Sequence, residues 1–316
     1  RQHPASDRGR MRLVLAARTA SFGGLIDYAG LFPPASRTMD EAVAEYARLR
    51  SGDQRWIVGA FLCRASELES LAAAAVRHLG RGDPAWEVRA IFDMGPGAGA
   101  MLVNDFHSEM SPAITVTSVE AKTPRSDPEA IATTIESVGS LENDTAIFIE
   151  VVRGDAIRTQ IDAIAVNLRS RGRTGGAKLR CGGRDPDDCP DVDEVADFVW
   201  SATGERLPFK ATAGLHHPIR HFDDDLDGWR HGFVNLLMAS VACDDGADPD
   251  TVRAIIAETD PEAFSVTAAA ARWRDIHLPG SAIRRSRRNG FIAFGSSDID
   301  GPIEDLDDLG FLGEGM

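Results

Sequence analysis

Short apolar, β-branched runs alternate along the chain with segments of helical character. Eight runs have the length and composition of strands: Leu25–Ala29, Ile57–Cys63, Glu87–Asp93, Ile114–Ala121, Ala146–Val152, Ala177–Cys181, Pro208–Ala213 and Phe291–Gly295. Alternating strands and helices favour parallel strands joined by crossover helices, and a closed barrel needs eight such strands. The pattern therefore predicts an α/β fold of the (β/α)8, TIM-barrel type.

Helix start signals stand between these runs. Thr38-x-x-Glu41 and Ser66-x-x-Glu69 fit capping boxes. Asp127-Pro128 places a cap residue before a first-turn proline. Asp191-x-x-Glu194 begins a helix that ends before Gly204. Each signal indicates that a helix begins where the alternation requires one.

The interval from 219 to 290 is too long for a normal βα unit. It contains three segments of helical character, Phe233–Val241, Thr251–Glu258 and Pro261–Arg274. We interpret it as an insertion of helices over one end of the barrel; the alternative is that Phe233–Met238 is itself a strand. With no internal repeat and no linker, the chain is expected to form one domain over 21–316. Residues 1–20 are expected to form an N-terminal extension, disordered at its start, with Met11 as the natural first residue.

The net charge of −15 disfavours binding to nucleic acid or to an anionic membrane surface. No apolar run approaches the roughly 20 residues that span a bilayer. The four cysteines are scattered without a CxxC pair, which argues against a disulfide framework and for a reducing compartment. We expect a cytoplasmic protein, and a barrel of this size often self-associates.

Lysine is nearly absent. Of 34 basic residues only Lys122, Lys178 and Lys210 are lysines. An arginine cannot lose its proton to act as an amine nucleophile, so the retained lysines are candidates for chemistry that arginine cannot perform. Lys178 and Lys210 each lie in a predicted strand that runs into a glycine-containing loop, and they are one βαβ step apart.

Neighbouring strands can bring these two amines together. If their faces point into the barrel, each ammonium lowers the pKa of the other, and burial adds to the shift. A lysine with a lowered pKa attacks carbonyl groups to form a Schiff base. The alternatives are that the lysines bind an anionic substrate as plain charges, or that they form structural ion pairs.

Glycines and hydroxyl residues at the ends of the last three strands predict an anion site. Backbone N–H groups there can approach a phosphate or carboxylate without obstruction by a Cβ. The candidate ligands, with Arg180 as a bidentate donor, are Arg180, Gly183, Thr212, Gly214, Ser296 and Ser297.

Several segments, in order from about residue 24 to 300, resemble deoxyribose-phosphate aldolases. They are LIDYAGLFPPASRTMDEAV at the start, AIFIEVV with Glu150, AKLRCGG and FKATAGLHHP around the two lysines, and AFGSS at the phosphate-binding last strand. The resemblance implies that Lys178 forms the Schiff base, that Lys210 tunes its pKa and that Asp27 assists proton transfer. We expect no cofactor. The family's proton-relay aspartate on the fourth strand has no evident counterpart in ITVTSVEAK.

A histidine-rich loop follows Lys210. His216, His217 and His221 lie within six positions of one another, and neutral imidazole is the commonest metal ligand in proteins. Three interpretations stay open: contact with substrate or general-base catalysis by His216 or His217, a metal site made by all three, or a structural loop.

Two carboxylates and one thiol complete the candidates. Glu150 lies in an apolar run, so it must be paired or protonated; it is a catalytic acid/base, a partner for Lys178 or part of a structural salt bridge. Glu120 and Lys122 share a strand face and are expected to form an intra-strand ion pair. Cys181 alternates to the other face from Lys178 and is expected to be a buried core thiol.

The function expected from these residues is a lyase of aldolase type that forms a lysine Schiff base with a small carbonyl substrate bearing a phosphate or carboxylate. One alternative is a metal-dependent hydrolase or lyase that uses the His216/His217 loop. The other is a non-catalytic barrel that serves as a scaffold or binds a ligand.

Overall fold

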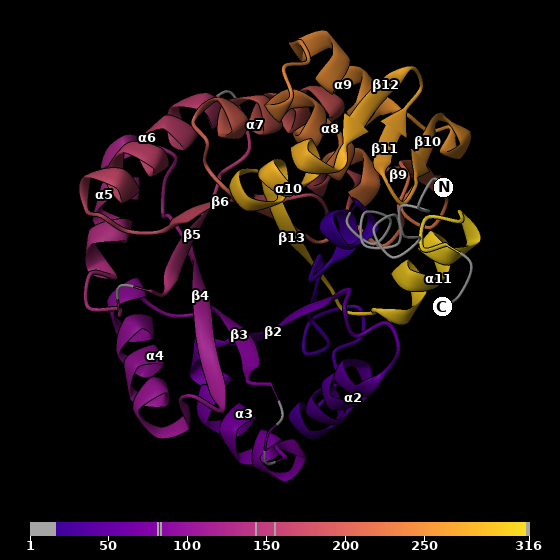
Figure 1. Ribbon diagram of the computed structural model, residues 1–316. Coiled ribbons are helices and arrows are strands. Elements are labelled where there is room, and N and C mark those ends of the chain that lie inside the picture. The colour runs from indigo at the N-terminus through magenta and orange to yellow at the C-terminus, as the bar shows by residue number, and fades with distance from the viewer. Residues whose placement is uncertain (1–16, 81, 83, 143, 155, 314–316) are drawn as a thin grey trace, which may run out of the picture.

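Eight parallel strands close into a barrel in the computed structural model, which describes residues 17–80, 82, 84–142, 144–154 and 156–313 (Figure 1). The strands are β1 (Ile26–Tyr28), β2 (Val58–Arg64), β3 (Trp86–Ile91), β4 (Ile114–Lys122), β5 (Ala146–Glu150), β6 (Gly175–Arg180), β7 (Phe209–Thr212) and β13 (Phe291–Ser296). Each strand pairs with its neighbour in the chain, and β13 closes the ring between β7 and β1. The predicted (β/α)8 fold and all eight predicted strands are confirmed.

Helices surround the barrel. They are α2 (Met39–Ser51), α3 (Leu68–Ala75), α4 (Pro96–Met110), α5 (Pro128–Ser137), α6 (Ile157–Ser170), α7 (Val192–Gly204), α8 (Phe233–Asp244), α9 (Pro249–Ala257), α10 (Gly280–Asn289) and α11 (Asp300–Asp308). Residues 17–22 are also helical, and the first part of the expected N-terminal extension lies outside the described residues.

Three of the four predicted helix starts are confirmed. Thr38 and Asp191 form capping boxes, and Asp127 accepts a hydrogen bond from the Ala130 N–H at 2.9 Å. The box predicted at Ser66 is wrong. Its hydroxyl donates instead to the Asp93 carboxylate, and a short 3-10 turn over Ala65–Glu67 leads into α3. A tertiary partner thus replaces the local cap.

The 219–290 interval differs from its predicted form. Phe233–Val241 and Thr251–Glu258 are helical, as α8 and α9, but Pro261–Arg274 is not one helix. It forms a 3-10 turn and most of an antiparallel sheet made by β10 (Phe264–Val266), β11 (Ala270–Trp273) and β12 (Ile276–Pro279). The apolar positions Phe264, Val266, Ala271 and Trp273 alternate within two short strands, which the helical interpretation overlooked.

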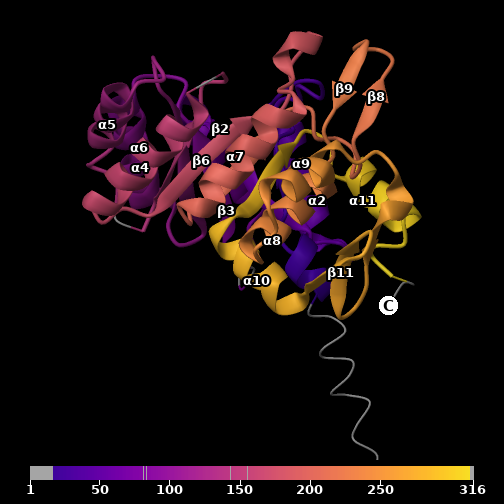
Figure 2. The same cartoon turned by 90° about the horizontal axis from the view of Figure 1, so that it is seen from above.

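The inserted helices lie on the side of the barrel, not over one end. α8 is buried along Phe233–Ala242, because α7, α9 and α10 pack around it and β13 lies beneath it. A hairpin of β8 (His221–Asp223) and β9 (Gly228–Arg230) projects instead from the end where the parallel strands finish (Figure 2).

Aromatic side chains fill the space between strands and helices. Tyr28, Tyr46, Phe61 and Trp86 form one set of ring contacts, with centroids 5.1–5.9 Å apart. Because this outer layer holds the fold together, the interior of the barrel can carry polar groups. None of the described helices is long and apolar enough to span a bilayer.

Candidate active site in the barrel interior

Ionisable side chains from six strands meet inside the barrel. They are Asp27 (β1), Arg89 (β3), Glu120 (β4), Glu150 (β5), Lys178 (β6) and Lys210 (β7). Side chains alternate between the two faces of a strand, and Glu150, Lys178 and Lys210 are direct register partners, so all three face inward together. Barrel interiors are usually filled by branched apolar side chains. A charged layer here is therefore a departure that needs a reason.

Glu120 bridges the two lysines. Its Oε2 lies 2.8 Å from Nζ of Lys178, and its Oε1 contacts Nζ of Lys210. Lys178 also lies 3.0 Å from Oε2 of Glu150. All three members of the bridge are buried, with Lys178 the more open lysine at 7% side-chain exposure against 2% for Lys210. The amines thus flank one carboxylate, as expected for side chains that share the barrel interior.

The intra-strand pair expected between Glu120 and Lys122 is wrong. Lys122 is exposed and lies 3.4 Å from Glu150, whereas Glu120 contacts the two buried lysines across the barrel. The register accounts for the contact of Lys122, which is the register partner of Glu150 on β5. Glu120 stands two residues earlier on the same strand face, and its carboxylate reaches the amines of β6 and β7 across the barrel.

Asp27 sits at the opposite side of Lys210. Its Oδ2 lies 3.2 Å from Nζ of Lys210 and 2.9 Å from Nε of Arg89, while its Oδ1 accepts the Ala60 N–H at 3.0 Å. A Cβ on Gly59 would lie 2.5 Å from Oδ1, so glycine at that position makes room for the carboxylate. Asp27 is completely buried, and the contacts continue from Arg89 through Asp27 to Lys210.

The pKa values of the two lysines are shifted in opposite directions. Burial opposes the charge on Lys178, but Glu120 and Glu150 outweigh burial and raise its pKa. Burial, helped by Arg89, outweighs Glu120 and Asp27 at Lys210, so its pKa is lowered. Burial also opposes the charge on Glu120, yet the lysines hold its pKa far below the usual range. The expected mutual repulsion of two amines is thus replaced by the effect of the carboxylate between them.

The predicted anion ligands lie around the C-terminal mouth of the barrel. Arg180, Thr212 and Gly295 are register partners on β6, β7 and β13, one layer above the lysines, and Arg180 is exposed there. Gly182 and Gly214 touch, since a Cβ on Gly182 would lie 3.0 Å from the Gly214 Cα. The loops after β6 and β7 therefore run side by side.

The other predicted anion ligands have partners of different kinds. The Gly183 carbonyl accepts from Nη1 of Arg230 at 3.4 Å, and the Ser296 hydroxyl donates to the carbonyl of Asp298. The Ser297 hydroxyl is buried and meets no hydrogen-bond partner among the residues that the structure describes. Ser297 is thus the member of this set with an unused donor.

The histidine loop borders a cavity of about 500 Å³ beneath the β8–β9 hairpin. His216 and His217 line it with His221, whose ring meets that of His217 edge-on at 4.6 Å between centroids. Nδ1 of His217 lies 2.6 Å from Asp305, and Nδ1 of His221 lies 3.1 Å from the Ile219 carbonyl. Burial lowers the pKa of His216, with Arg230 and His217 adding to the shift.

Metal binding by this loop gains no support from the geometry. Within the described part of the chain, no group of three or more His, Cys, Asp or Glu side chains is arranged to hold a metal ion. Cys181 is buried, as expected, and burial raises the pKa of its thiol, which keeps it protonated.

Three residues of the site were not assigned to it from the sequence. Glu120 was named but given the wrong partner. Glu120 and Lys178 each lie two residues before the end of their strand, and this shared position indicates that both are near the C-terminal end of the barrel. Arg89 had no signal beyond its inward phase on β3. Arg230 lies over the Gly182–Gly214 contact and pairs with Asp223 at 2.9 Å, a position set by the hairpin.

Comparison with known proteins identifies no relative: no family model, no curated protein and no solved structure matches the chain. The site is therefore interpreted from its own geometry and chemistry.

Proposed function

We propose that the chain is a lyase of aldolase type that forms a Schiff base between a lysine and a small carbonyl substrate carrying a phosphate or carboxylate. The observation that carries the proposal is the Glu120 carboxylate held between two buried lysines at the C-terminal end of the barrel. Active sites of such barrels lie at that end. A buried ionic network stabilises a fold weakly, or not at all, compared with apolar packing, so a functional reason for keeping it is favoured.

Lys178 is the proposed nucleophile. It is the more open of the two lysines and sits directly below Arg180 and the mouth. Its raised pKa means that it must first lose a proton, and Glu120 offers the route, because its two oxygens contact the two amines. Lys210, whose pKa is lowered, is proposed to release its own proton to solvent first and then to act as the acceptor. Transfer of one proton from Lys178 through Glu120 to Lys210 leaves the total charge of the network unchanged.

The chemistry then proceeds in balanced steps. The neutral Lys178 amine adds to the substrate carbonyl carbon, and loss of water gives an iminium ion. The substrate carries a hydroxyl on the carbon β to the iminium carbon, and a base removes the proton of this hydroxyl. The bond between the α and β carbons then breaks. Its electron pair enters the iminium to give an enamine, and the hydroxyl-bearing fragment leaves as the first carbonyl product. Glu150, 3.0 Å from Lys178, is the proposed base. Protonation of the enamine and addition of water release the second product and restore the amine.

The anionic group of the substrate is proposed to lie at the mouth. Arg180 supplies an exposed guanidinium that makes no hydrogen bond or ion pair with the described residues and can form a bidentate pair, and Ser297 supplies a buried hydroxyl without a hydrogen-bond partner among them. Thr212 and the Gly214 loop border the same opening.

Borohydride trapping tests the proposal. The protein is incubated with a panel of small aldehydes and ketones bearing phosphate or carboxylate, reduced with borohydride, and analysed by intact mass and peptide mapping. We expect a covalent adduct on Lys178 in the wild type and in Lys122→Arg, the matched exposed control, and none in Lys178→Arg, which keeps the charge but loses the nucleophile.

Two outcomes would contradict it. An adduct that persists in Lys178→Arg but disappears in Lys210→Arg would move the imine to Lys210. No adduct with any member of the panel, while the protein is folded and binds the same compounds reversibly, would favour the non-catalytic ligand-binding alternative.

A further inference from the structure

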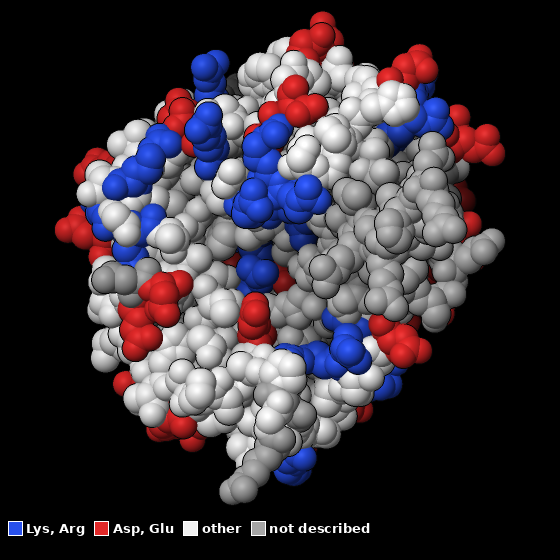
Figure 3. Space-filling model, viewed as in Figure 1, with Lys and Arg blue, Asp and Glu red and all other residues white. Residues whose placement is uncertain are grey.

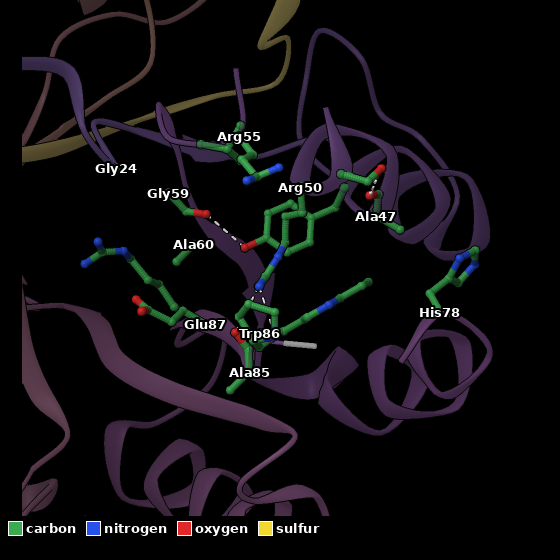
Figure 4. Close-up of a pocket in the computed structure, with 15 residues that line it drawn as sticks. Gly24, Ala47, Arg50, Arg55, Gly59, Ala60, His78, Ala85, Trp86 and Glu87 are labelled. Atoms are coloured by element: carbon green, nitrogen blue, oxygen red, sulfur yellow. Dashed lines mark hydrogen bonds between the residues drawn. The ribbon is translucent and has the colours of Figure 1, made fainter. Parts of the chain in front are cut away.

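A second, larger cavity opens at the N-terminal ends of β2 and β3, beside α2 (Figure 4). Its volume is about 710 Å³, within the roughly 300–1,000 Å³ typical of small-molecule sites. The lining residues that matter here are Arg50, Arg55, Arg89, Glu87, Tyr46 and Trp86. The proposed lyase reaction uses the other end of the barrel, so this cavity has no role in it.

The charged groups of the cavity are mainly cationic. Three guanidinium groups line it with His78 and a single carboxylate, Glu87. Arg50 is fixed: it donates to the carbonyls of Pro84 and Ala85, both at 3.0 Å, and lies over the Tyr46 ring at 5.7 Å. In Figure 3, which faces this end of the barrel, Lys and Arg side chains gather around the central hollow.

Two of the guanidinium groups have unused donors. The Arg55 side chain is exposed and makes no hydrogen bond or ion pair with any residue the structure describes. Arg89 touches Asp27 through Nε, but its terminal nitrogens form no hydrogen bond within the same part of the chain. Free guanidinium donors that converge on a cavity suit an oxyanion, which they can bind in a bidentate manner.

A further arginine adds positive charge next to the cavity. Arg287 of α10 is half-buried and donates to the carbonyls of Gly23 and Phe291. Burial, followed by the nearby Arg89 charge, lowers the pKa of Arg287 to about 10, although Asp27 opposes the shift. Cations that destabilise one another are stabilised by a bound anion.

We propose that this N-terminal cavity binds a small organic anion, in which a phosphate or carboxylate group contacts Arg55 and Arg89 and an apolar body lies against the wall formed by Tyr46, Val58 and Ala60. The apolar wall favours an organic anion over a free inorganic one. This site is separate from the mouth at the C-terminal ends, and it does not depend on the proposed lyase activity.

The bound anion is coupled to the lysine pair. Arg89 reaches Lys210 through one carboxylate, since Oδ2 of Asp27 lies 2.9 Å from Arg89 and 3.2 Å from Lys210. Lys210 also faces Glu120 from β4 and the Phe148 ring from β5, 5.6 Å from its centroid. An anion on Arg89 offsets the charge that helps to lower the pKa of Lys210. Occupancy of the cavity is therefore expected to raise that pKa.

The scarcity of lysine makes this coupling measurable. The chain has three lysines, so a protein labelled with [ε-¹³C]lysine gives three side-chain signals, which Lys→Arg variants assign. Phenyl phosphate and benzoate, with inorganic phosphate for comparison, are titrated by calorimetry and by NMR. We expect saturable binding of at least one aromatic anion, stronger than that of inorganic phosphate, and a higher titration midpoint for Lys210 in the complex.

Matched variants locate the site. Loss of one charge-assisted contact in Arg55→Ala is expected to weaken binding about tenfold or more, whereas Arg158→Ala, an exposed arginine on α6, leaves it unchanged. No saturable binding, or equal affinity in Arg55→Ala, would overturn the proposed site. Weaker binding in Arg180→Ala but not in Arg55→Ala would place the ligand at the other end of the barrel. Binding at Arg55 without a response from Lys210 would refute the coupling.

Discussion

Replacing Glu120 by glutamine tests whether its charge, rather than its shape, holds the two lysines. Glutamine keeps the volume and one acceptor oxygen but leaves three cations, Lys178, Lys210 and Arg89, to share Asp27 and Glu150. Removing one partner of a buried ion pair costs about 3–5 kcal/mol. We therefore expect the free energy of unfolding to fall by about that amount at pH 7.

Release of a proton by one of the two lysines sets an upper limit on the stability that Glu120→Gln loses. The variant can discharge one lysine instead of burying it unpaired, and neutralising an amine of ordinary pKa, about 10.4, costs about 4.6 kcal/mol at pH 7, since each pH unit corresponds to about 1.36 kcal/mol. The folded variant then binds one proton fewer than its unfolded chain, so its stability rises with pH, by up to about 1.4 kcal/mol per unit.

The wild type lacks this gain from Lys178 and Glu120. At Lys210 the pKa is already lowered in the wild type, but the Glu120 charge opposes that shift, so removing the charge enlarges the gain with pH. The raised pKa of Lys178 means that its stabilisation is complete below its unfolded pKa and is lost only when the pH rises through the folded value. The lowered pKa of Glu120 contributes above its unfolded pKa and is lost only as the pH falls through the folded value. Between pH 7 and 9 neither contribution changes. The difference in stability between wild type and variant should therefore narrow as the pH rises.

Urea unfolding at pH 7, 8 and 9, followed by fluorescence of the five tryptophans, measures this difference. Glu150→Gln is the matched control: its carboxylate is 12% exposed and partly solvated, so a smaller loss is expected. A deficit for Glu120→Gln below about 1 kcal/mol, the range of a surface ion pair, would refute the reasoning, as would a deficit that stays constant or grows with pH.

Three further changes test the structure around the site. Gly59→Ala should lower the free energy of unfolding by about 1–3 kcal/mol, because the new Cβ would lie 2.5 Å from a buried carboxylate oxygen. Gly204→Ala is the control and should not lower it, because a Cβ at that position would have no atom within 4 Å. Thermal unfolding compares the two variants. Asn235→Ala should cost about 2–4 kcal/mol in urea, since its buried amide satisfies two backbone carbonyls and one N–H; a loss under 1 kcal/mol would show that the groups find other partners. His217→Ala should change stability by less than about 1 kcal/mol, because the His217–Asp305 contact is exposed, and a larger loss in the same assay would assign it a structural role.

The candidate site was predictable in part. The spacing of Lys178 and Lys210, one βαβ step apart and in phase on their strands, was sufficient to place them on neighbouring strands facing inward. Glu120 was not placed correctly, because period-two alternation shows which residues share a face of one strand but not which residue stands at the same height across the barrel. That height depends on the stagger of all eight strands.

Local sequence by itself determined the strand count, their order and most helix starts, since these follow from the apolar alternation and from caps that act within four residues. Tertiary structure decided the rest. Ser66 finds Asp93 instead of its local cap, and 264–279 pairs into a small antiparallel sheet. The ionic partners of Glu120 and Arg89 lie on other strands of the barrel, up to 90 residues away. Such contacts depend on barrel closure, because closure alone brings distant strands to one interior. Closure also sets the burial and the neighbouring charges that raise the pKa of Lys178 and lower that of Lys210.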